Sequence, residues 1–130
     1  MGNASIKRVN FEDVQMRGAL LISVLPNDDQ SVLIDGTVRS GEEVAAVEDA
    51  IKRKIPIIVY GRHANDEAAQ AKYAQLCTLG STAYLYGGGL FEWLLMQEVY
   101  GTDLFPTSGS TLDHLKYKAP SLFSKRYLTN

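Results

Sequence analysis

Short apolar runs alternate along this chain with longer amphipathic stretches. The apolar runs cover residues 19–25, 32–34, 57–60 and 83–86, and polar, glycine or proline residues bound each of them. Runs of this length that are rich in β-branched and aromatic residues are typical of strands buried on both faces. The pattern therefore predicts four strands, of which residues 32–34 form the shortest.

The first long amphipathic stretch, residues 40–54, predicts a helix. Ser40 and Glu43 have the spacing of a capping box. Apolar residues recur at helical spacing, and we expect them to form the buried face: Val44, Val47 and Ile51. Basic residues at the end of this stretch and Pro56 beyond it predict that the helix ends there. A short helix is also predicted after Asn10, a good capping residue.

Two further helices are predicted downstream. The first runs from residue 65 or 66 to residue 79, and its apolar face comprises Ala69, Tyr73, Leu76 and Cys77. Because Cys77 lies on that face, we expect it to be a buried structural cysteine. The second covers residues 90–100 and is apolar on most sides, so we expect it to be largely buried.

Strands that alternate with helices predict an α/β fold, in which helices cover both faces of a mostly parallel central sheet. We expect this domain to span residues 1–101. Residues 102–130 show no clean period, yet they are too apolar for a disordered tail. We interpret them as an irregular C-terminal arm, with a short helix near residues 112–115, packed on the domain or on a partner.

Composition limits the classes of partner. The net charge of −2 gives no reason to expect nucleic acid or an anionic membrane as the main partner. Cys77 is the only cysteine, which excludes an internal disulfide and a multi-cysteine zinc site and favours a reducing, cytoplasmic compartment. No apolar run is long enough for a membrane span. We expect no cofactor and no metal site.

The first residues partly match an N-myristoylation signal at Gly2. Ile6 stands where serine or threonine is usual, and Ser5 is one place early. A single acyl chain would anchor the protein only weakly. A membrane-tethered adaptor, anchored through Gly2, is one alternative function.

The loop that follows the strand at residues 57–60 is the strongest candidate for a site. In open α/β sheets, sites form beyond the carboxyl ends of strands, where loops enter helices. The inward backbone N–H groups of such a loop and the positive end of the helix form an anion cradle. The loop comprises Gly61, Arg62, His63, Ala64, Asn65, Asp66 and Glu67.

At this loop the sequence resembles the rhodanese-like family, over roughly residues 10–101. The strand at 57–60 is followed by a short loop and a helix, and the strand at 83–86 is followed by Gly88-Gly89 and then Trp93. The order of elements from residue 20 to Trp93 is also similar. The resemblance implies a parallel sheet between helices and persulfide-based sulfur transfer from thiosulfate. In relatives with a longer loop, it implies phosphatase chemistry.

The residues that this chemistry needs are replaced here. The resemblance puts the family's cysteine at Gly61, its loop glycine at Ala64 and its closing basic residue at Asp66, with Glu67 next. Two carboxylates would repel thiosulfate or phosphate, by about 4 kcal/mol per like-charge pair at about 4 Å and an effective dielectric near 20. We therefore predict a catalytically inactive rhodanese-like module that binds a protein partner.

Several alternatives stay open. A sulfurtransferase or phosphatase-related enzyme could use Cys77, or a cysteine supplied by another chain. Arg62 and His63, the basic residues of the loop, are either solvated or hold a small anion, a phosphorylated partner or an acidic peptide. The Asp-Val-Arg run common on the family's first strand is absent, and Asp35 with Arg39 is either a displaced version or unrelated.

Overall fold

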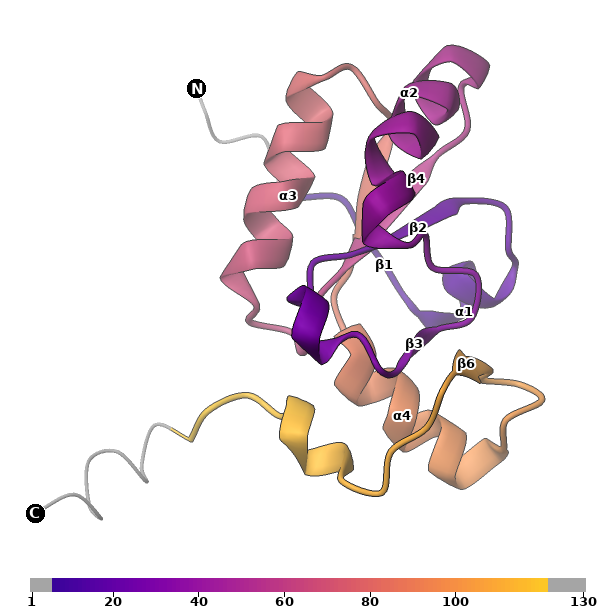
Figure 1. Ribbon diagram of the computed structural model, residues 1–130, viewed down its shortest axis with the longest axis vertical. Helices are drawn as coiled ribbons and strands as arrows, with labels where there is room; N and C mark the ends of the chain where they lie inside the picture. The colour runs from indigo at the N-terminus through magenta and orange to yellow at the C-terminus, as the bar shows by residue number, and fades with distance from the viewer. Residues whose placement is uncertain (1–5, 122–130) are drawn as a thin grey trace, which may run out of the picture.

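The computed structural model describes residues 6–121, so Gly2 lies outside the described part. Its central sheet has four parallel strands in the order β1-β5-β4-β2. The strands are β1 (Arg8–Val9), β2 (Leu20–Ser23), β4 (Ile57–Tyr60) and β5 (Ala83–Tyr86). The helices are α1 (Phe11–Gln15), α2 (Glu43–Arg53), α3 (Glu67–Thr78) and α4 (Gly89–Tyr100). Helices lie on both faces of the sheet (Figure 1), which confirms the predicted α/β class.

Alternate residues of the central strands enter two separate cores. Ile57 and Val59 of β4 pack with α2 and α3, whereas Ile58 and Tyr60 pack with α1 and α4. All four side chains are buried. Burying an apolar side chain of this size contributes roughly 1.5–3 kcal/mol. The apolar run at 57–60 is therefore a strand buried on both faces, as predicted.

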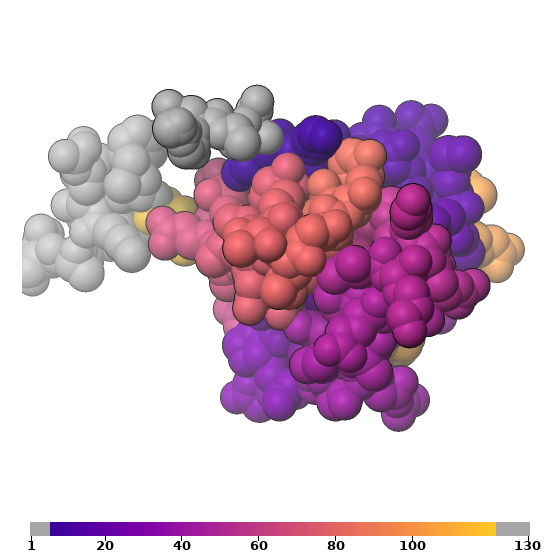
Figure 2. All heavy atoms as spheres, turned by 90° about the horizontal axis from the view of Figure 1, so that it is seen from above, coloured from indigo at the N-terminus to yellow at the C-terminus, as the bar shows by residue number. Residues whose placement is uncertain are grey.

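Helices α2 and α3 lie side by side over one face of the sheet (Figures 1 and 2). The ammonium of Lys72 on α3 forms an ion pair with the carboxylate of Glu43 on α2. Val47 of α2 and Leu76 of α3 are buried in the core that these helices share with the sheet.

The predicted capping box at Ser40 is wrong. The chain enters α2 through a 3-10 turn, η2 (Ser40–Glu42), so the helix begins at Glu43. Glu42 is the N-cap residue, and its side chain makes no capping hydrogen bond. The extra turn explains the error, because it moves Ser40 three residues ahead of the helix.

Two expected core positions, Val44 and Cys77, are also exposed. The buried side of α2 is centred on Val47 and Ala50, and Val44 is turned by about 120° from Ala50 around the helix axis. Cys77 is turned by about 100° from the buried Leu76 and lies near the end of α3. The interpretation of Cys77 as a buried structural cysteine is therefore wrong.

The predicted strand at 32–34 exists but does not join the parallel sheet. As β3 (Leu33–Ile34), it pairs antiparallel with β6 (Thr107–Ser108), which belongs to the C-terminal arm. One link to the sheet is a hydrogen bond from the Ile34 N–H to the Tyr60 hydroxyl, at 3.1 Å. That hydroxyl also lies 2.7 Å from Thr37 Oγ1.

The described part of the arm packs on the domain. Phe105 and Tyr117 are buried in the core that α4 shares with the sheet. The Trp93 indole N–H donates to the Pro106 carbonyl at 3.0 Å. The short helix expected near 112–115 is present slightly later, as the 3-10 helix η3 (His114–Tyr117). A further 3-10 helix, η1 (Asn27–Asp29), lies in the polar turn at residues 27–30.

Strand β1 and helix α4 differ from the prediction. The two-residue strand β1 was not predicted, because two residues carry no periodic pattern. Helix α4 buries Leu90, Trp93 and Leu94, but its last turn exposes Val99 and Tyr100, so it is less buried than predicted.

Within residues 6–121, none of the helices has both the length and the apolar character that a membrane crossing requires.

Candidate functional site

The loop at residues 61–67 lies where the sequence predicts it, between the carboxyl end of β4 and the start of α3. Asp66 is the N-cap residue of α3, and its Oδ1 accepts a hydrogen bond from the Ala68 N–H at 3.0 Å. A capping carboxylate at this end also interacts favourably with the helix dipole. Asp66 therefore caps α3.

The second oxygen of Asp66 turns back into the loop. Asp66 Oδ2 accepts a hydrogen bond from the Arg62 N–H at 2.9 Å. A Cβ built on Gly61 would lie 2.3 Å from Asp66 Oδ2, far inside van der Waals contact. The protein's own carboxylate therefore occupies the space beside Gly61, where the predicted cradle would receive an anion.

The start of α4 holds the loop from the other side. The Leu90 N–H donates to the Gly61 carbonyl at 2.9 Å, and the Phe91 N–H donates to the Arg62 carbonyl at 2.8 Å. Gly89 has a φ of +68°, and a Cβ there would lie 2.8 Å from the backbone nitrogen of His63. The loop thus satisfies two of the free N–H groups at the start of α4 and is fixed between two helices.

Arg62 is engaged inside the protein. Its guanidinium forms an ion pair with the carboxylate of Asp29, which is only 6% exposed. Lys116 Nζ of the arm lies 2.8 Å from the other oxygen of Asp29. The hydrogen bond from Lys116 and the charge of Arg62 lower the pKa of Asp29, against the effect of burial. One buried carboxylate therefore joins the loop to the arm.

The remaining loop residues face the surface or support the turn. His63 Nδ1 accepts a hydrogen bond from the Asn65 N–H at 3.2 Å. Ala64, Asn65 and Glu67 are exposed. These residues are available for contact with another molecule.

An open depression of about 640 Å³ adjoins the loop. Its apolar part comes from the segment after β2 and from the end of the described arm: Val24, Leu25, Pro26, Ala119 and Pro120. Arg62, His63 and Glu67 border it on the loop side. The arrangement combines apolar surface with charged groups of both signs, as protein-binding surfaces do.

Cys77 is not brought to this site. It lies ten residues after Glu67 on α3, about 15 Å along the helix from the loop. Among residues 6–121, no cluster of three His, Cys, Asp or Glu side chains is placed to hold a metal ion. Sequence reasoning missed Asp29 and Lys116, which no motif distinguishes from the other charged residues of a polar turn and an arm.

No family model matches the sequence, and no curated protein matches it either. Solved structures are nevertheless similar in fold. A full-length protein from Lactobacillus plantarum gives a TM-score of 0.60 at 16% identity, over 79% of this chain and 88% of that chain. A second structure of a protein from that organism gives 0.50 at 16% identity, over 69% and 83%. A protein from Bacillus halodurans gives 0.55 at 14% identity, over 92% and 88%. Identities this low establish a shared fold alone.

Proposed function

We propose that this protein is a rhodanese-like module that has no sulfurtransferase activity and acts by binding another protein. One observation carries the proposal: the Asp66 carboxylate fills the space beside Gly61. Persulfide-based sulfur transfer needs a thiolate at this position, stabilised by backbone N–H groups. Gly61 supplies no thiol, and the Arg62 N–H is already bonded to Asp66.

Charge around the loop supports the same proposal. Asp66 and Glu67 place two carboxylates where thiosulfate or a phosphate group would have to approach. The guanidinium of Arg62 offers little compensation, because it is paired with Asp29. An anionic donor would therefore meet net repulsion at the loop.

The surface beside the loop supports a binding role. The depression there has an apolar part and a charged edge, and the loop is held by hydrogen bonds to α4 and by the Arg62–Asp29 ion pair. A surface that is already ordered loses little conformational entropy when a partner binds. We infer that a segment of the partner occupies this depression.

The first test is for activity. The purified full-length protein and its Cys77→Ala variant are incubated with thiosulfate and cyanide, and thiocyanate is measured. We expect no thiocyanate above the protein-free blank from either protein. Thiocyanate formed by the wild type and lost in Cys77→Ala would overturn the non-enzymatic role and establish Cys77 as the nucleophile.

The second test concerns the partner. Wild-type protein is immobilised and proteins retained from an extract of the source cells are identified by mass spectrometry. A charge reversal at the loop, Glu67→Lys, is compared with the matched reversal Glu48→Lys on the exposed side of α2. We expect a specific partner to be lost with Glu67→Lys and kept with Glu48→Lys. A partner retained equally by both variants would show that the loop is not the binding surface.

A further inference from the structure

Helix α4 is apolar on most sides, but the fold covers only one of them. A helix of this composition is normally buried all round. Here Leu90, Trp93 and Leu94 face the core of the domain. Leu95 and Val99 lie about 140–180° around the axis from Leu90, and both are exposed. The outer side of α4 therefore presents apolar side chains that this chain does not cover.

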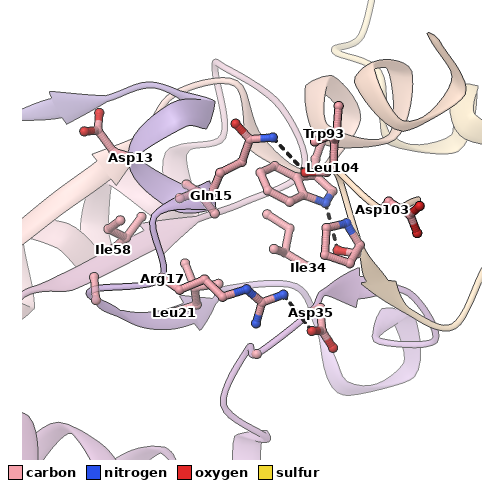
Figure 3. Close-up of a pocket in the computed structure, with 14 residues that line it drawn as sticks. Asp13, Gln15, Arg17, Leu21, Ile34, Asp35, Ile58, Trp93, Asp103 and Leu104 are labelled. Carbon is pink, nitrogen blue, oxygen red and sulfur yellow. Dashed lines mark hydrogen bonds and ion pairs between the residues drawn. The ribbon is translucent and has the colours of Figure 1, made fainter. Parts of the chain in front are cut away.

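The inner side of α4 and the start of the arm are fixed to the domain. The Trp93 indole borders a cavity of about 330 Å³ and donates to the Pro106 carbonyl (Figure 3). Gln15 Nε2 of α1 donates to the Leu104 carbonyl at 2.7 Å on the same side. The arm is thus held where it leaves α4, so the outer surface of the two segments is already ordered before any partner binds.

The arm adds apolar surface beside α4. Its 3-10 helix η3 packs on α4, at the end of the molecule away from α2 (Figure 1). Leu112, just before η3, and Leu115, within it, are exposed. Within residues 6–121, six of the nine exposed large apolar side chains lie between residues 95 and 115. Exposed apolar surface is therefore concentrated on these two segments, and such concentrations mark interaction sites.

The size of this surface fits a protein partner. We define the outer face by four residues, with exposed fractions of 41% for Leu95, 72% for Val99, 104% for Leu112 and 61% for Leu115. Together they expose roughly 500 Å², within the roughly 300–600 Å² of the largest patches on monomers. A standard interface buries about 800 Å² on each partner, with a polar rim around an apolar centre. The outer face thus supplies more than half of the area that one copy contributes to a dimer.

The charges at the edge of the outer face complement a second copy of themselves. Asp113 stands at the start of η3 and Lys118 at its end, and both are exposed. Within residues 6–121, neither side chain forms an ion pair. A two-fold axis reverses the direction of η3 in the second copy, which brings Asp113 of one copy to the side where the other has Lys118.

From the area and the charges we infer that the outer face binds a second copy of this chain. The product is a symmetric dimer, in which α4 and η3 of the two copies pack against each other. Two-fold dimers are the commonest assemblies and require a patch that is complementary to itself. The depression at the loop contains none of the four residues of the outer face. The dimer therefore leaves that depression open, and the inference is independent of the function proposed for the loop.

Sedimentation velocity of the full-length protein, from submillimolar to low micromolar concentration, tests the inference. We expect a reversible dimer of twice the chain mass of 14.3 kDa. Val99→Lys places a charge in the outer face and should weaken dimerisation by at least about tenfold. Val44→Lys on α2 is the matched control, because Val44 is a helical valine that is 73% exposed, and it should leave dimerisation unchanged.

A second pair of variants tests the contribution of the arm. Leu112→Lys should weaken dimerisation, whereas Met16→Lys, at an exposed apolar residue after α1, should not. Circular dichroism verifies that each variant folds, which exposed positions favour. A monomer at every concentration would overturn the proposal. A dimer that Val99→Lys weakens no more than Val44→Lys, or Leu112→Lys no more than Met16→Lys, would place the interface elsewhere and overturn it too.

Discussion

The Asp66 carboxylate occupies the position that a side chain on residue 61 would take. A Cβ on Gly61 would lie 2.3 Å from Asp66 Oδ2 and 2.8 Å from Asp66 Cβ. In the sequence, the glycine after β4 and the acidic residue at the end of the loop look like two unrelated features. The structure joins them, because Asp66, in its capping position, lies where a Cβ on residue 61 would be.

This contact predicts that Gly61→Ala lowers the free energy of unfolding by about 1–3 kcal/mol, the usual cost of overpacking. The measurement is urea denaturation of the variant. Gly18→Ala is the matched control, because a Cβ at Gly18 has no atom within 4 Å. If the contact is the cause, the cost of Gly61→Ala disappears in an Asp66→Gly background, and an unchanged cost there would contradict the explanation.

The same contact predicts that a cysteine cannot simply be restored. In a Cys77→Ala background, Gly61→Cys should form no persulfide with thiosulfate, because Asp66 crowds and repels the site. Intact-mass spectrometry measures the added sulfur. The variant that combines Gly61→Cys with Asp66→Gly removes both the crowding and the repulsion. It should form a persulfide more readily than Gly61→Cys alone. Persulfide in the single-cysteine variant that still carries Asp66 would show that the carboxylate is no barrier.

The ion pairs of Asp29 predict a pH-dependent contribution to stability. Asp29→Asn should lower the free energy of unfolding by about 1 kcal/mol at neutral pH, because its partners Arg62 and Lys116 are partly exposed and therefore screened. Since the pKa of Asp29 is lowered in the folded protein, its contribution is complete above the ordinary value near 4 and is lost as the pH falls below it.

Urea denaturation of wild type, Asp29→Asn and the exposed control Asp28→Asn between about pH 2 and 7 measures this effect. The difference between wild type and Asp29→Asn should shrink below about pH 4. A difference that stays constant with pH would show that the charge of Asp29 is not the cause.

The close approach of α4 to the loop predicts that Gly89→Ala is severely destabilising. A Cβ at Gly89 would lie within 2.9 Å of three backbone atoms of residues 61–63, and backbone cannot move aside as a flexible side chain can. Gly101 isolates the steric part, since it also has positive φ but no atom within 4 Å of a built Cβ. We expect Gly101→Ala to cost about 1 kcal/mol and Gly89→Ala at least about 1 kcal/mol more, measured by thermal unfolding.

The buried hydroxyl of Tyr60 predicts instability in alkali. Burial raises its pKa to about 12, although its hydrogen bonds with Thr37 and with the Ile34 N–H oppose the shift. Because the folded-state pKa is higher than the unfolded value, stability is complete below about pH 10 and falls as the pH rises towards 12, by about 2–3 kcal/mol at the upper limit.

Tyr60→Phe removes this titration and also leaves the Ile34 N–H without its partner. It should therefore cost about 1–3 kcal/mol at neutral pH and show a shallower decline above pH 10. Denaturation curves of both proteins at neutral and alkaline pH compare the two slopes. Equal slopes would exclude Tyr60 as the titrating group, and the buried Tyr86, whose pKa is raised as well, would then be tested in the same way.

The strands and long helices could be predicted because their information is local. Residues 57–60 and 83–86 are continuous apolar runs bounded by polar, glycine or proline residues, and runs of this kind are typical of buried strands. Which residues of each helix are buried could be predicted less reliably. Cys77 and Val44 have apolar neighbours at helical spacing, yet a rotation of about 100° around the axis separates a buried position from an exposed one.

The sequence alone determined the α/β class, the position of the loop at residues 61–67 and the absence of a cysteine in it, because these depend on residue type and on neighbours along the chain. Tertiary structure decided that Asp29, 33 residues before Arg62, pairs with it, and that β3 leaves the parallel sheet to join the arm. It also decided that a cavity opens beside Trp93. These features arise where segments distant in sequence meet, and their geometry follows from packing, which no local pattern encodes.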